Sequence, residues 1–218
     1  HHLDDSLVAA EELISTLVEI STLDAGTISP KLSHFPADQM LQKLAAELTL
    51  LCHQKGIEFN YVPCHATIYS DEQHLRRIVQ NFLTNAMRYT PSGRVLLGCR
   101  VKQDSLEIQV WDTGVGIAPQ KLNEVFDEFK RLDHPETQDI RGLGLGLAIA
   151  DRTAKLLGHS LTIKSWQGKG SLFGVRVPTG DSTKIITKAT TDNYYSGGGG
   201  NLANMTVLCI DNEASILL

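Results

Sequence analysis

The 218-residue sequence lacks a long hydrophobic run, an excess of positive charge and a cysteine framework. No apolar stretch approaches the ~18 residues that a membrane-spanning helix needs, and no signal peptide opens the chain. The formal net charge of −5 gives no basic field, so we expect no nucleic-acid partner. Four cysteines without Cys-x-x-Cys spacing are typical of reduced thiols. We expect a cytoplasmic protein, and the sequence leaves open whether a full-length form is anchored in the inner membrane.

Hydrophobic periodicity predicts both helices and strands. Apolar residues recur with helical spacing in residues 37–54 and 71–89, and they alternate along residues 105–111. The predicted helices cover residues 3–22, 37–54 and 71–89, a short segment after Pro119 that includes Phe126 and Phe129, and the segment from the glycine run to Gly158. The predicted strands cover residues 28–35, 56–62, 66–70, 94–102, 105–111, 160–165 and 170–177. This order predicts a mixed, mostly antiparallel sheet with helices on one face, a two-layer α/β sandwich.

The flanking segments differ from this central unit. The first helix carries a heptad-like stripe that includes Ile14 and Leu17, so we expect it to pack against another helix. A polar, glycine-rich stretch after the last strand is typical of a linker. The final "MTVLCIDNEASILL" predicts a strand, a turn and a beginning helix, too short for a domain. The predicted organisation is therefore a helix within 1–26, a domain over 27–179, a linker over 180–204 and a truncated unit over 205–218.

Two asparagines lie four residues apart in "NFLTNAMRYT" of the second central helix. Asn81 and Asn85 therefore share one face, next to the inward-facing Phe82 and Ala86. An unpaired buried amide is costly, and neutral side-chain oxygens suit Mg²⁺ that is also held by phosphates. We favour a binding function over a pair of surface amides.

A carboxylate stands at the end of an apolar strand in "WDTGVGI". Asp112 in this place can accept a hydrogen bond from the exocyclic amine of adenine, whereas guanine offers an acceptor there. Gly114 and Gly116 would let a ring come close to the backbone. The same letters also suit an Asx turn, and the pattern alone does not separate the two interpretations.

Three glycines precede a helix in "RGLGLGLAIA". A glycine in a helix or strand costs up to about 1 kcal/mol relative to alanine, but it bares the N–H groups of a helix N-terminus to an anion. A flexible turn before a buried helix is the simpler alternative. The polar stretch at 130–140, between "VFDEFKR" and this run, could form a lid over a nucleotide.

The ordered series "NFLTNAMRYT", "DTGVGI", "FDEF", "GLGLGLAI" and "GSLFGVRVP" closely resembles the ATP-binding catalytic domain of sensor histidine kinases. That family has the Bergerat (GHKL) fold, which it shares with gyrase, the Hsp90 chaperones and MutL. The resemblance covers residues 28–178. The preceding helix resembles the second helix of the family's dimerisation and phosphoacceptor hairpin. The tail "VLCIDNE" resembles the first strand of a receiver domain, which implies a hybrid kinase.

The resemblance implies a site for ATP and Mg²⁺ on these motifs. It implies that Asn85 binds Mg²⁺, that Asn81 is its neighbour in the phosphate site, and that Arg88 faces the phosphates. Tyr89 would line the nucleotide pocket, and Asp112 would bind adenine. Lys130 and Arg131 are further candidates for binding the γ-phosphate. Three glycines would form a lid hinge and expose the helix N-terminus: Gly142, Gly144 and Gly146. Ser171 would support Asp112 through a water molecule.

Three functions fit this resemblance: a histidine kinase, an ATP hydrolase, and an ATP-dependent interaction module. The hydrolysing relatives carry a glutamate where this chain has Asn81, and a neutral amide cannot deprotonate water. We therefore expect phosphoryl transfer to a histidine. The family's acceptor histidine lies on the first hairpin helix, which we expect to be missing from this fragment. The implied partners are the protein's own hairpin and receiver, a response regulator or phosphotransfer protein, and a second copy in a homodimer.

Overall fold

The computed structural model describes residues 14, 16–18, 20–130 and 144–185. The chain divides into two compact units, His1–Ile186 and Thr187–Leu218, and every described residue belongs to the first. The predicted linker beyond residue 185 and the predicted truncated unit at 205–218 therefore lie outside the described residues. In the described part of the chain, no helix is long and apolar enough to cross a membrane.

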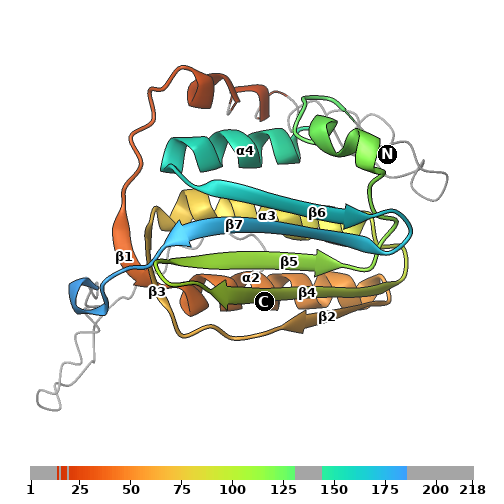
Figure 1. Ribbon diagram of the computed structural model, residues 1–218, viewed down its shortest axis with the longest axis horizontal. Helices are drawn as coiled ribbons and strands as arrows, with labels where there is room; N and C mark the ends of the chain where they lie inside the picture. The colour runs from red at the N-terminus through yellow and green to blue at the C-terminus, as the bar shows by residue number, and fades with distance from the viewer. Residues whose placement is uncertain (1–13, 15, 19, 131–143, 186–218) are drawn as a thin grey trace, which may run out of the picture. The chain divides into compact units, whose positions relative to one another are not determined.

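A five-stranded mixed sheet forms one layer, with strand order β2-β4-β5-β7-β6 (Figure 1). Its strands are β2 (Ile57–Tyr61), β4 (Gly93–Val101), β5 (Ser105–Asp112), β6 (Ser160–Trp166) and β7 (Gly170–Pro178). Only the β2–β4 pair is parallel among these neighbours, and the other three pairs are antiparallel. The predicted mixed, mostly antiparallel sheet is confirmed.

Three helices cover one face of this sheet: α2 (Ala37–Gln54), α3 (Glu72–Arg88) and α4 (Gly146–Leu157) (Figure 1). Leu106, Ile108 and Val110 of β5 point to this face and are at most 1% exposed, as the alternation along the strand predicts. The Phe82 ring of α3 lies 5.6 Å from the Phe173 ring of β7, centroid to centroid. Each such side chain contributes about 1.5–3 kcal/mol when fully buried, so this packing holds α3 in place against the sheet.

Two predicted elements differ in the structure. β1 (Ser33–Pro36) is shorter than the predicted strand over 28–35, and it pairs with β3 (Thr67–Ser70) in a separate two-stranded sheet. The short helix after Pro119 is a 3-10 helix, η1 (Pro119–Glu124), which ends before Phe126. Phe126 packs against the core, whereas Phe129, which we predicted to share the helix, is 55% exposed. A second 3-10 helix, η3 (Ser182–Lys184), follows the sheet.

The described residues between 14 and 24 are helical, as the heptad-like stripe predicts. Ile20 is buried against Leu145 and Ile149 at the start of α4. Asp24 accepts a hydrogen bond from the Arg152 guanidinium at 2.8 Å, and Arg152 also pairs with Glu128. The end of this helix is thus attached to α4, close to the glycine run.

Candidate functional site

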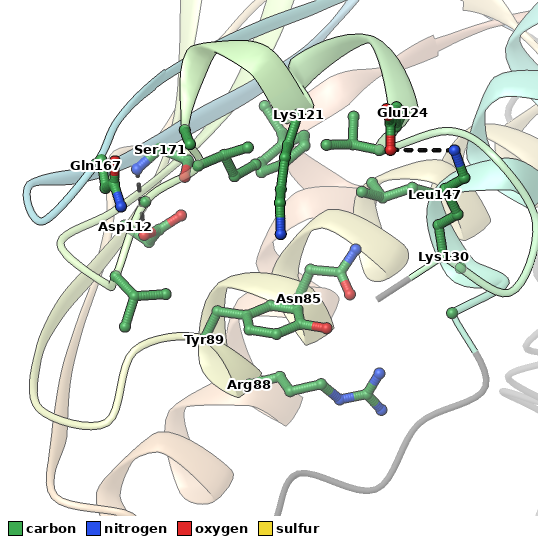
Figure 2. A pocket seen from close by; sticks show the side chains of 18 residues that line it. Asn85, Arg88, Tyr89, Asp112, Lys121, Glu124, Lys130, Leu147, Gln167 and Ser171 are labelled. Carbon is green, nitrogen blue, oxygen red and sulfur yellow. Dashed lines mark hydrogen bonds and ion pairs between the residues drawn. The ribbon is translucent and has the colours of Figure 1, made fainter. Parts of the chain in front are cut away.

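A pocket lies where the carboxyl end of α3 meets the end of β5, η1 and the start of α4 (Figure 2). It collects predicted residues that are far apart in the sequence. The predicted site residues that line it are Asn85, Arg88, Tyr89, Asp112, Gly116, Lys130, Gly144, Gly146 and Ser171. Asn81 and Gly114 lie outside its lining. Arg131, Gly142 and all of the predicted lid at 130–140 except Lys130 lie outside the described residues.

Asp112 is the last residue of β5 and is held by the backbone on both sides. Its Oδ1 accepts hydrogen bonds from the Gly114 N–H at 2.8 Å and from the Ser171 N–H at 3.2 Å. Among the described residues, no group donates to its Oδ2. The side chain is 8% exposed, and desolvation raises the pKa of Asp112 to about 6, although the two backbone hydrogen bonds oppose this rise. The site thus presents one carboxylate oxygen of fixed orientation.

Ser171 supports Asp112 through its backbone, and the predicted water bridge between the two residues stays a prediction. The Ser171 backbone N–H donates directly to the carboxylate, because Ser171 and Asp112 are paired residues of β7 and β5. The Ser171 hydroxyl instead lies 2.9 Å from the Ser165 hydroxyl. The Ser165 hydroxyl also accepts a hydrogen bond from the Ile117 N–H at 2.7 Å, which ties the loop after β5 to the neighbouring strands.

The two glycines after Asp112 accommodate other parts of the chain. A Cβ on Gly114 would lie 2.1 Å from the Tyr89 carbonyl oxygen, and a Cβ on Gly116 would lie 2.1 Å from the Trp166 carbonyl oxygen. We predicted that these glycines leave room for a ring, but the space beside each is filled by backbone. Their role is to let the loop pack closely against α3 and the β6–β7 turn.

The last turn of α3 supplies three polar side chains to the pocket. Asn85, Arg88 and Tyr89 share one face because residues three and four apart on a helix are neighbours. The adjoining face carries the buried Phe82 and Ala86, so the helix cannot rotate without exposing its apolar side. Figure 2 shows Asn85 and Arg88 extending from α3 into the pocket on the side away from Asp112.

Asn81 lies one helical turn earlier, beside the N-terminus of α4. A Cβ on Gly146 would come within 3.3 Å of the Asn81 Oδ1, so glycine allows this close packing. The Asn81 Nδ2 is buried and has no hydrogen-bond partner among the described residues. An unsatisfied buried donor costs about 1–3 kcal/mol, which fits a place where an acceptor binds.

The start of α4 offers further donors. Its N-cap residue, Leu145, provides no side-chain cap for the first N–H groups. Gly144 has a φ of +70°, and a Cβ there would lie 3.0 Å from the Lys130 carbonyl oxygen. Glycine is therefore required where the chain passes Lys130 and enters the helix, and the free helix terminus faces the pocket.

Three polar pocket residues that the motifs did not predict are Lys121, Glu124 and Gln167. Lys121 and Glu124 face the pocket together because side chains three apart align on a 3-10 helix, whereas Leu122 and Val125 pack against the core. Lys130 is held by Glu124 at 3.0 Å and by Asp127 at 3.1 Å. The proline at the start of η1 was a signal for the helix, but it did not indicate which face meets the pocket.

The chemistry of the pocket is divided between its ends. Asp112 can accept a hydrogen bond from an amine, and Arg88 and Lys121 offer positive charge to an anion. In the described part of the chain, no group of three or more His, Cys, Asp or Glu side chains is placed to hold a metal ion. Asn85 adds one neutral oxygen, so a cation here would need oxygens from the ligand as well.

Comparison with known proteins relates the fold and the site to one family. Residues 70–181 match the profile described as "Histidine kinase-, DNA gyrase B-, and HSP90-like ATPase". The chain is 29% identical over 175 residues to the autoinducer 2 sensor kinase/phosphatase LuxQ of Vibrio vulnificus, covering 76% of this chain and 20% of that protein. It is 27% identical to hybrid signal transduction histidine kinase B of Dictyostelium discoideum, covering 85% of this chain and 10% of that protein. The chain thus spans a fifth or less of the length of these relatives.

A solved structure agrees with these sequence matches. Full-length ShkA in complex with AMPPNP superposes with a TM-score of 0.72 at 28% identity, covering 83% of this chain and 38% of that one. The similarity extends over most of the chain, beyond the residues that the family profile matches.

Proposed function

The chain belongs to the family of histidine kinase-, DNA gyrase B- and HSP90-like ATPases, and from this premise we propose that it is the ATP-binding catalytic domain of a sensor histidine kinase. The observation that carries the proposal is the pocket itself, with a buried carboxylate at one end and, at the other, an uncapped helix N-terminus and two cations, Arg88 and Lys121, that have no ion-pair partner among the described residues. That division suits a nucleoside triphosphate, which has a neutral base and a charged tail.

Asp112 selects adenine in this proposal. The two backbone N–H groups hold its Oδ1 and leave Oδ2 available to the exocyclic amine. Guanine presents a carbonyl oxygen at that position, and two acceptors that face each other in a buried site leave the carboxylate unsatisfied. The pocket should therefore bind ATP in preference to GTP.

Asn85 is the side chain that would hold Mg²⁺, together with oxygens of the bound phosphates. Mg²⁺ takes oxygen ligands and neutralises phosphate charge. The fit is supported by the Asn85 amide in the pocket, and the Asn81 Nδ2, which has no partner among the described residues, suits an acceptor oxygen of the same phosphates. Arg88 and the uncapped start of α4 supply donors to the same phosphates. Asn85→Ala should abolish the enhancement of ATP binding by Mg²⁺ and leave adenosine binding unchanged, as measured by calorimetry with and without the metal.

Transfer to a histidine is favoured over hydrolysis by what faces the phosphate end. Asn81 is neutral and cannot act as a general base toward water. The second carboxylate that lines the pocket, Glu124, is paired with Lys130 at 3.0 Å. A slow hydrolase and an ATP-dependent interaction module are the alternative functions, and both predict no phosphohistidine.

We extend the proposal to the organisation of the whole protein. Residues 1–26 would belong to the second helix of a phosphoacceptor hairpin, residues 27–179 to the catalytic domain, 180–204 to a linker and 205–218 to a receiver domain. Mg²⁺, a homodimeric hairpin, and a response regulator or phosphotransfer protein complete the assembly. The contact of Ile20 and Asp24 with α4 supports a helix that is attached to the catalytic domain.

The test is phosphoryl transfer to a separately supplied hairpin domain. The chain is incubated with that domain and with ATP labelled in the γ-phosphate, and the products are treated with acid. Slow, acid-labile labelling of the hairpin is expected, because the tethered effective concentration is lost. Release of free phosphate without a labelled hairpin would instead favour the hydrolase.

A further inference from the structure

Lys121 extends across the pocket from the side opposite α3, and no motif of the sequence includes it. Its position follows from η1, in which the buried Val125 and the partly buried Leu122 anchor one face of the turn. Lys121 and Glu124 occupy the other face, and both line the pocket. Figure 2 shows the Lys121 side chain reaching down from η1, with its ammonium group between Asp112 and Asn85 in this view.

The charges around the pocket distinguish Lys121 from Lys130. The Lys130 ammonium group lies 3.0 Å from Glu124 and 3.1 Å from Asp127, so a phosphate would have to compete with two carboxylates for it. The side chain of Lys121 makes no ion pair or hydrogen bond with any residue that the structure describes. Within the described lining, Lys121 and Arg88 are therefore the cations available to an anion.

The position along the pocket decides which part of a ligand Lys121 meets. Asp112 marks the end for the base, and Asn85, Asn81 and the start of α4 mark the end for the terminal phosphates. An ammonium group between them faces the part of a nucleotide that joins the base-bearing ribose to those phosphates. The ribose offers neutral hydroxyls there, whereas the first phosphate offers charged oxygens that a lysine binds as a point charge.

We propose that Lys121 binds the α-phosphate of the nucleotide and so makes the site selective for nucleotides over nucleosides. The inference rests on the proposed nucleotide site and adds a residue and a specificity to it. The contact does not require Mg²⁺, because the Lys121 ammonium group itself supplies the positive charge. The proposal predicts that Lys121 strengthens the binding of AMP, ADP and ATP equally and does not affect the binding of adenosine.

The experiment compares adenosine, AMP and ADP binding to the unmodified chain and to Lys121→Met, without Mg²⁺, by NMR titration. Lys121→Met should weaken AMP and ADP alike by roughly tenfold and leave adenosine unchanged. Lys121→Arg, which keeps the charge, should recover most of the loss. Lys164→Met is the matched control, since Lys164 is an exposed lysine outside the pocket lining and carries the same charge.

The outcomes separate this inference from the proposed function. Unchanged AMP binding in Lys121→Met, or an equal loss for adenosine and AMP, would overturn the role of Lys121 while ATP binding by the unmodified chain stands. An equal loss in Lys164→Met would also overturn it, because the effect would then be one of net charge. Failure of the unmodified chain to bind any adenine compound would overturn the nucleotide site itself.

Discussion

The two ends of the pocket are constructed in different ways. At the base end, Asp112 belongs to a central strand, and backbone N–H groups on both sides fix its carboxylate. At the phosphate end, Lys121, Lys130 and Arg88 are long side chains on a 3-10 turn, a loop and the last turn of a helix. The base end is fixed by backbone hydrogen bonds before a ligand binds, whereas the phosphate end would bind its ligand through the charges of long side chains. Base selection should therefore depend on the fold, and phosphate binding on individual cations.

The largest effect is expected where the base end depends on backbone packing. Gly114→Ala would place a Cβ 2.1 Å from the Tyr89 carbonyl oxygen and 2.9 Å from the Thr90 hydroxyl, and the Tyr89 backbone cannot move aside as a flexible side chain could. We expect a loss of about 3 kcal/mol or more in the free energy of unfolding, as measured by urea denaturation. Gly98→Ala is the control, because its Cβ would make an ordinary 3.6 Å contact with Val62. Equal stability of the two variants would show that the loop is not fixed by this contact.

Asp112→Ala should affect binding rather than folding. Removal of a buried charged acceptor costs about 1.5–3 kcal/mol, so ADP and ATP should both bind about 10- to 150-fold more weakly. Asp104→Ala, an exposed aspartate in the turn at the other end of β5, should leave both affinities unchanged. Calorimetry measures the affinities of both variants for ADP and ATP. A loss confined to ATP would assign Asp112 to the phosphates and remove the distinction between the two ends.

The pKa of Asp112 gives the base end its own pH dependence. Because burial raises that pKa from 3.8 to about 6, the carboxylate that accepts the adenine amine is lost as the pH falls through 6. Adenosine, which carries no phosphate, should bind about tenfold more weakly at pH 5 than at pH 8. Asp112→Asn should show no such change in an NMR titration. A pH-independent affinity in the unmodified chain would contradict the carboxylate as the acceptor.

The same raised pKa predicts a stability effect of opposite direction. An acid whose folded-state pKa is raised lowers the stability above that pKa, and the penalty is relieved as the pH falls through it. Asp112→Asn should therefore raise the free energy of unfolding at pH 8 relative to the unmodified chain, and the gain should shrink below pH 6. Urea denaturation at both pH values checks this sign.

The sequence could predict the base end better than the phosphate end. Alternation along β5 puts Asp112 on the same face as Leu106, Ile108 and Val110, at the point where the strand ends, so its burial follows from periodicity. The role of Lys121 could not be predicted, because it depends on how Leu122 and Val125 orient a single 3-10 turn against the core. The same turn ends before Phe129, which adopts a φ of +58° and is exposed. The spacing of apolar residues in the sequence does not predict this backbone conformation or the exposure of Phe129.

The smallest effect is expected at the ion pairs beside the phosphate end. Arg152 joins Asp24 of the first helix to Glu128, two residues before Lys130. Because these side chains are partly exposed, Arg152→Met should lower the free energy of unfolding by no more than about 1 kcal/mol and leave adenosine binding unchanged. Lys155→Met removes an ion pair that lies within α4 alone and whose lysine is more exposed than Arg152, and it is the control. A larger loss for Arg152 in thermal unfolding would mean that the helix contact stabilises the domain substantially.

The central claim is that this pocket binds an adenine nucleotide through Asp112, and the direct test is a titration of the unmodified chain with ATP and with GTP in the presence of Mg²⁺. We predict that ATP binds and that GTP binds at least about tenfold more weakly, because guanine leaves the buried carboxylate unsatisfied. Equal binding of the two nucleotides, or binding of neither, would contradict the account.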